Sequence, residues 1–92
     1  MDQAAQSELS LFVFPNPSNS TITIRYVLKK SSVVRVELYS SHGRLVKRLL
    51  EDYKERGEYS VLLDGDTLAS GLYVVRLCAN DGTIYRRLLF LK

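Results

Sequence analysis

Few residues in this chain of 92 carry the side chains that catalysis needs. His42 is the only histidine, so a Ser–His–Asp or Cys–His arrangement would have to use it. It lies in a turn with Ser40 and Ser41, and serines are common in turns because their hydroxyls bond to turn backbone. The only cysteine, Cys78, lies far away in an apolar segment, which predicts a buried small hydrophobe. We therefore expect no catalytic site.

The sequence also lacks the residues that metal and cofactor sites need. A zinc site needs three or four Cys, His or carboxylate ligands, and one cysteine with one histidine falls short of that set. The Asp64-Gly65-Asp66 segment has carboxylates, but it lacks the spacing of a dedicated calcium loop and predicts a turn. The five glycines are isolated at turns and form no phosphate-binding loop. The sequence predicts no metal and no cofactor, and a single cysteine excludes a disulfide within the chain.

Composition indicates one ordinary globular domain. Hydrophobic residues make up 46% and charged residues 25% of the chain, and the net charge is +3. Acidic residues lie among the basic ones, so no basic face of the kind that binds nucleic acid is expected. No apolar run reaches the roughly 18 residues of a transmembrane helix. Residues 1–8 are polar and predict a linker or disordered leader, followed by a folded domain over residues 9–92.

Apolar and polar residues alternate with a period of two from residue 9 onward, which predicts β-strands. Turn signals recur every 8–12 residues or so, a spacing typical of a β-sandwich. We expect an all-β sandwich of about seven short antiparallel strands. Residues 45–50 would also fit a short helical stripe, but the all-β context favours a strand there. Residues 51–57 predict a charged loop. The expected strands cover residues 9–14, 21–28, 34–39, 44–50, 59–63, 72–79 and 83–91.

The predicted core is rich in aromatic side chains. Each strand has one apolar face to turn inward, and aromatic residues bury large areas when they occupy such faces. We expect five of them to fill much of the core: Phe12, Phe14, Tyr26, Tyr59 and Tyr73.

Four segments, in this order, resemble the C-terminal sorting domain of the type IX (Por) secretion system of Bacteroidetes-type bacteria. The first is Phe14-Pro15-Asn16-Pro17-Ser18 with the strand that follows it. The second combines Val36-Glu37-Leu38-Tyr39 with Gly43-Arg44-Leu45-Val46. The third runs from Leu68 to Leu77 and contains Gly71 and Tyr73, and the fourth is the basic, apolar end from Arg86 to Lys92. The first segment is also similar to the Ig-like domain of flagellar hook-capping proteins.

This resemblance implies an Ig-like β-sandwich that acts as a secretion signal and not as an enzyme. The outer-membrane translocon would recognise the domain, and a sortase-like protease would act on it after export. The parent protein would pass through the periplasm and then reach the cell surface or be secreted and anchored. The alternative is a non-catalytic Ig-like accessory module for carbohydrate binding, adhesion or structural assembly. No transmembrane segment and no nucleic acid partner is implied.

The resemblance also implies which residues matter. We expect the final strand to lie at a sheet edge, where apolar contact would supply affinity and positive charge would orient the partner. Basic residues there would also protect an edge strand from aggregation, and an unprotected edge would allow a weak homodimer. The expected recognition residues are Arg86, Arg87, Leu89, Leu91 and Lys92. The motif residues expected to act mainly through structure are Pro15, Asn16, Pro17, Gly43, Gly71 and Tyr73.

Overall fold

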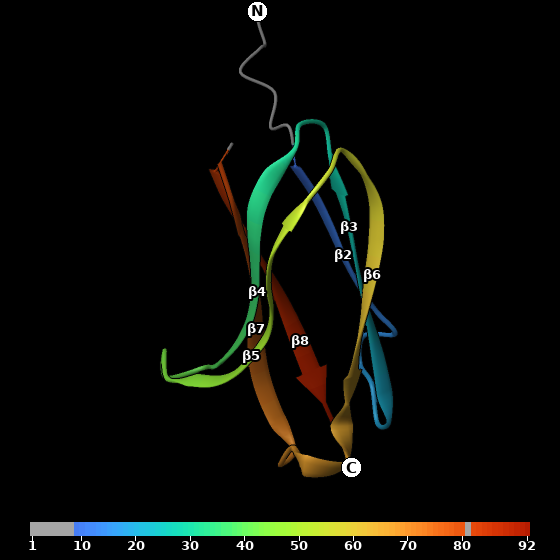
Figure 1. Ribbon diagram of the computed structural model, residues 1–92. Helices are drawn as coiled ribbons and strands as arrows, with labels where there is room; N and C mark the ends of the chain where they lie inside the picture. The colour runs from blue at the N-terminus through green and yellow to red at the C-terminus, as the bar shows by residue number, and fades with distance from the viewer. Residues whose placement is uncertain (1–8, 81) are drawn as a thin grey trace, which may run out of the picture.

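Two antiparallel sheets face each other in the computed structural model, which describes residues 9–80 and 82–92 (Figure 1). One sheet has the order β2-β3-β6, with β2 at Leu9–Phe14, β3 at Thr21–Leu28 and β6 at Gly57–Asp64. The other has the order β5-β4-β7-β8, with β5 at Leu45–Lys54, β4 at Ser32–Ser40, β7 at Gly71–Ala79 and β8 at Gly82–Phe90. A short 3₁₀ helix, η1 (Gly65–Thr67), follows β6. The predicted all-β sandwich of seven strands is confirmed.

The apolar residues that recur at every second position of the sequence form the inner face of each sheet. In β3, for example, Ile22, Ile24 and Tyr26 are fully buried, whereas Thr21 and Arg25 on the alternate positions are exposed. Successive side chains of a strand point to opposite faces of the sheet, so apolar residues at alternate positions all face the core. The buried apolar side chains are Leu9, Leu11, Ile22, Ile24, Tyr26, Leu28, Val34, Val36, Leu38, Leu63, Leu68, Tyr73, Val75, Leu77, Leu88 and Phe90.

The prediction that Phe12 and Phe14 help to fill the core is wrong. The register of β2 against β3 places Leu11 opposite the buried Tyr26, so Leu11 takes the inward position. Because faces alternate, Phe12 and Phe14 then lie on the outer face, where they are 51% and 43% exposed. The run Leu9–Phe14 is apolar on both faces, and its pairing partner decides which face is buried.

The tyrosines of the predicted core do lie there. Tyr26 and Tyr73 are buried, and Tyr59 packs partly buried against the core, with its ring stacked on Tyr26 at 5.4 Å between centroids. Burial, with smaller contributions from Tyr59 and Asp52, raises the pKa of the Tyr26 hydroxyl to about 12.

Strand β5 is longer than predicted, because it continues through residues expected in a charged loop. Asp52 lies opposite Val34 of β4, and Tyr53 lies opposite Val33. On an edge strand the charged side chains stay in water while the backbone pairs. The register shifts twice along this pair, between Val36 and Glu37 and again between Leu38 and Tyr39. No helix within the described residues is long and apolar enough to cross a bilayer.

Candidate functional site

The turn between β2 and β3 is fixed to the outer edge of β8 by the side chain of Asn16. Its Nδ2 donates to the carbonyl oxygen of Arg87 at 2.9 Å, and its Oδ1 accepts from the amide of Leu89 at 2.9 Å. A carboxamide carries a donor and an acceptor together, as the backbone of a neighbouring strand does. Asn16 therefore replaces one residue of a strand at the edge of the four-stranded sheet.

Backbone pairing continues from this point toward the end of the chain. The Ser18 amide donates to the Leu89 carbonyl at 2.9 Å, and the Leu91 amide donates to the Ser18 carbonyl at 2.8 Å. Pro15 and Pro17 flank Asn16, both after cis peptide bonds, and neither has an N–H to leave unpaired. The first and the last segments that the sequence analysis singled out are thus one structure.

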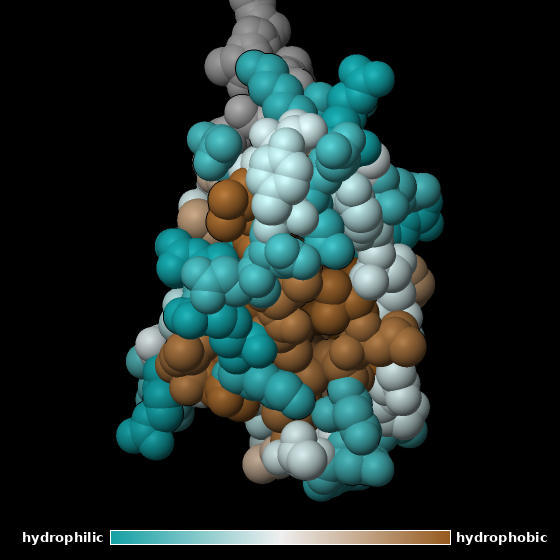
Figure 2. All heavy atoms as spheres, in the orientation of Figure 1, coloured by the Kyte–Doolittle hydropathy of each residue, from teal (hydrophilic) through white to brown (hydrophobic). Residues whose placement is uncertain are grey.

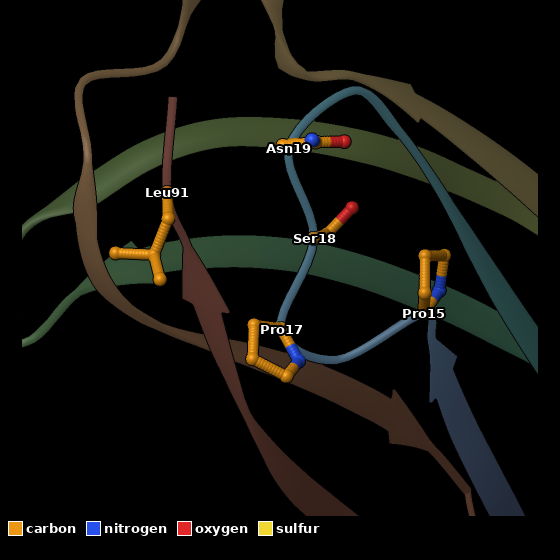
Figure 3. A pocket seen from close by; sticks show the side chains of 5 residues that line it. All are labelled: Pro15, Pro17, Ser18, Asn19 and Leu91. Carbon is orange, nitrogen blue, oxygen red and sulfur yellow. The ribbon is translucent and has the colours of Figure 1, made fainter.

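A hollow of about 400 Å³ lies beside this pairing, and we call it the terminal hollow (Figure 3). Figure 3 shows Leu91, just after β8, beside the turn that carries the other lining residues. Leu91 is 48% exposed, and Ser18 is buried with a hydroxyl that has no hydrogen-bond partner among the described residues. The lining combines apolar and polar side chains: Pro15, Pro17, Ser18, Asn19 and Leu91.

Arg86 joins the facing edges of the two sheets. Its Nε donates to the Leu11 carbonyl of β2 at 3.0 Å, and its Nη1 donates to the carbonyl of Tyr85 at 2.9 Å. Because carbonyls at a sheet edge need partners, one guanidinium satisfies an acceptor on each sheet. A second hollow, of about 370 Å³, lies beside it and is lined by Leu11, Phe12, Val13, Phe14, Asn16, Arg86 and Arg87.

The other predicted recognition residues divide between structure and surface. Lys92 is tied back, since its amide donates to Ser70 Oγ at 2.9 Å and its Nζ donates to the Asp66 carbonyl at 3.0 Å. Arg87 is exposed, and its guanidinium makes no ion pair within the described part of the chain. Leu89 is half-buried. Arg87, Leu89 and Leu91 therefore offer side chains to a partner, while Arg86 and Lys92 bond to the domain itself.

The remaining motif residues lie on other parts of the fold. Gly43 has a φ of 85° in the tight turn between β4 and β5, a conformation that favours glycine. Gly71 begins β7 opposite Phe90 of the terminal strand. Tyr73 is buried, and its hydroxyl donates to the Ala69 carbonyl at 2.6 Å.

The residues that could do chemistry take structural roles. Ser40 Oγ accepts from the backbone amides of His42 and Arg44, each at 3.3 Å, which stabilises the turn. Cys78 lies on β7, and within the described residues its hydrogen bonds are with Thr83 and Arg35 and not with His42. Among residues 9–80 and 82–92, no three His, Cys, Asp or Glu side chains lie close enough to hold a metal ion.

Cys78 is not the buried hydrophobe that its neighbours predict. Leu77 takes the inward position, so Cys78 faces outward and is half-exposed. The Thr83 hydroxyl lies 3.6 Å from its Sγ, and the Arg35 guanidinium lies 4.0 Å away. These contacts, the hydroxyl first, lower the pKa of the Cys78 thiol although partial burial opposes them.

A buried carboxylate organises the outer face of the four-stranded sheet. Glu37 is 2% exposed, and it accepts from Arg48 Nε at 3.0 Å, from the Tyr39 hydroxyl at 3.0 Å and from Arg76 Nη1 at 3.3 Å. Burial alone would raise the pKa of the Glu37 carboxyl. The hydrogen bonds from Tyr39 and Arg48, with the charges of Arg48 and Arg35, outweigh burial and hold that pKa below its ordinary value.

Replacing Glu37 tests this network through the pH dependence of stability. A carboxyl whose folded-state pKa is lowered stabilises the fold above its unfolded-state pKa, and the stabilisation disappears as pH falls through the folded-state pKa. We expect Glu37→Gln to lower the free energy of unfolding at pH 7 by about 1–3 kcal/mol. We also expect the difference from the parent to shrink as pH falls below the ordinary pKa of a glutamate carboxyl and through the lowered folded-state pKa of Glu37. Urea unfolding at several pH values measures both, and Glu51→Gln, at an exposed partner of Arg48, is the control.

Replacing Asn16 tests the link between the turn and the terminal strand. Asn16→Ala removes two hydrogen bonds, so we expect a loss of about 1–2 kcal/mol in the free energy of unfolding. We also expect faster amide hydrogen exchange at Leu89, whose N–H loses its acceptor, than in the parent. Asn19→Ala, in the same turn, should change neither. Unchanged exchange at Leu89 in Asn16→Ala would contradict the assignment.

Comparison with known proteins identifies a family that matches this chain. A family model described as "Secretion system C-terminal sorting domain" matches residues 12–90, which include the Asn16 turn, β8 and every strand between them. A comparison of the sequence with curated proteins finds no match. The alternative of an accessory Ig-like module gains no support from these comparisons. The family model covers most of the chain, so the protein belongs to the family of secretion-system C-terminal sorting domains, which direct their parent proteins to the type IX secretion system.

Proposed function

We propose that the outer-membrane translocon of the type IX system binds this domain at the terminal hollow and along the adjoining end of β8. One observation carries the proposal: the motif turn and the terminal strand, at opposite ends of the domain sequence, together form one hollow with both apolar and polar lining residues. A half-exposed leucine beside two proline rings is a surface that an apolar side chain of a partner can cover.

Charge and hydrogen bonding around the hollow support the same site. Arg87 carries an exposed positive charge next to Leu89, so an acidic partner would be oriented and attracted by it. Asn19 lines the hollow and is exposed, so its carboxamide can donate to and accept from a polar group of that partner.

Arg86 and Lys92 contribute by holding this surface in place. Arg86 bonds to Leu11, and Lys92 bonds to Ser70 and Asp66. These hydrogen bonds favour a role in covering the sheet edge over direct contact with a partner. Both still add positive charge near Arg87, which raises the encounter rate with an acidic surface.

The proposal includes the route of the parent protein. The parent crosses the periplasm, the translocon exports it, and a sortase-like protease removes the domain as the parent becomes anchored at the cell surface or is released. The domain itself catalyses nothing. A weak homodimer through a strand edge is compatible with this route where the edge lies away from the terminal hollow.

A point variant tests the hollow without removing the core. Deleting residues 86–92 would also remove Leu88 and Phe90, which are fully buried, and would unfold the domain. Leu91→Asp instead places a charge in the hollow at a side chain that is 48% exposed. Loss of about half of a leucine's burial free energy predicts roughly tenfold weaker binding. We expect the export of a periplasmic fluorescent reporter fused to the 92-residue chain to fall accordingly.

Val33→Asp is the matched control, because Val33 is 55% exposed and lies at the start of β4, outside the hollow. Thermal unfolding of both purified variants should stay close to that of the parent. Normal export of Leu91→Asp, or an equal loss of export with Val33→Asp, would contradict the proposed site.

A further inference from the structure

The sandwich has four edge strands, β2, β5, β6 and β8. Three of them have features that oppose pairing with another chain. Strands β2 and β8 face each other and are joined by Arg86 and Asn16. Strand β5 has two register shifts and five charged side chains, Lys47, Arg48, Glu51, Asp52 and Lys54. Bulges, charges and covering contacts all blunt the exposed backbone of an edge strand.

Strand β6 lacks these features along its middle, since its two charged residues, Glu58 and Asp64, lie near its ends. It pairs with β3 in one unbroken register along all of its length, and its middle, Tyr59–Leu63, is uncharged. Leu62 is 67% exposed, more than any other large apolar side chain of the described chain. Figure 1 shows β5 and β6 diverging from the turn that joins them, and Figure 2 shows apolar atoms gathered in the region between them. A regular, uncharged edge of this kind is a template for an added strand.

We propose that β6 pairs antiparallel with β6 of a second copy of this chain, around a two-fold axis at Ser60. The two three-stranded sheets would then form one continuous six-stranded sheet. Two-fold pairing requires opposite residues to share a face of the sheet, so only two registers pair nearly all of β6. One is centred on Ser60 and pairs residues 57–63, and the other is centred on Val61 and pairs residues 58–64.

Charge decides between these registers. The register centred on Val61 places Glu58 directly opposite Asp64, twice, and like charges directly opposite are destabilising. The register centred on Ser60 instead places Glu58 opposite Leu62 and brings Asp64 opposite Arg56 of the other copy. The Arg56 side chain is exposed, and only its backbone amide is engaged, by Ser31 Oγ at 3.2 Å. Self-complementarity of this kind is what a two-fold interface needs.

Apolar packing supports the same register. On the inner face, Tyr59 would lie opposite Val61 of the second copy, and both side chains are only partly buried in the single chain. An aromatic side chain opposite a β-branched one is a favourable cross-strand pair. Strand β6 lies at the edge of its sheet away from β2, and none of its residues lines the terminal hollow, so this dimer does not depend on the proposed translocon site.

Sedimentation velocity of the 92-residue chain over a range of concentrations up to about 1 mM tests the pairing. We expect a reversible dimer, and we expect Ser60→Lys, which puts two charges opposite each other at the axis, to raise its dissociation constant roughly fivefold or more. Ser10→Lys is the control: Ser10 lies on the outer face of the same sheet, on its other edge strand, β2.

A disulfide measures the register directly, because opposite residues of paired strands lie within disulfide range. In a Cys78→Ser background, Ser60→Cys should form a covalent dimer on mild oxidation much faster than Ser10→Cys. The proposal is overturned by a chain that stays monomeric at every concentration. It is equally overturned by a dimer that Ser60→Lys does not weaken, or by equal rates of disulfide formation at the two positions.

Discussion

The hydrogen bonds of the Asn16 carboxamide to β8 are the interaction on which the proposed translocon-binding surface depends. They connect residues 71 and 73 positions apart in the sequence and bring the first turn of the domain against its last strand. Ser18 and Leu91 can then pair through their backbones, Pro15 and Pro17 lie beside Leu91, and the edge of β8 is covered where the chain ends. Without this link, β8 would end as a bare edge and the terminal hollow would have only one wall.

The two open sides of the sandwich differ in how far side chains cover the backbone of the edge strands. Each side carries a different proposed contact. Between β2 and β8, side chains of Arg86 and Asn16 satisfy edge carbonyls and amides, so what remains for a partner is side-chain surface. Between β5 and β6 the described chain has no hydrogen bond of this kind, although the Lys54 ammonium lies 5.2 Å from the centroid of the Tyr59 ring. The edge of β6 still presents its backbone. A side-chain surface suits recognition by a folded translocon subunit, whereas a bare strand edge suits an added strand.

Much of the fold could be predicted from the sequence, because the period of two in segments such as Thr21–Leu28 records which face is buried. The run Leu9–Phe14 was ambiguous, since both of its faces are apolar and only pairing with β3 buries Leu11 in place of Phe12. The charges of residues 51–54 predict a loop, but β5 continues through them because an edge strand keeps charged side chains in water. The partnership of the turn with the terminal strand is not predicted by the sequence pattern. Its one signal is that Pro15 and Pro17 have no N–H, so the Asn16 carboxamide between them can supply both a donor and an acceptor.

The central claim is that the type IX translocon recognises this domain as a sorting signal. The most direct test fuses the 92-residue chain to a fluorescent protein with a periplasmic signal peptide, and compares a type IX-competent bacterium with the same strain lacking a working translocon. The account predicts that the reporter reaches the cell surface or medium in the first strain and stays in the periplasm of the second. Retention in the periplasm of both strains, with the fused domain folded, would contradict it.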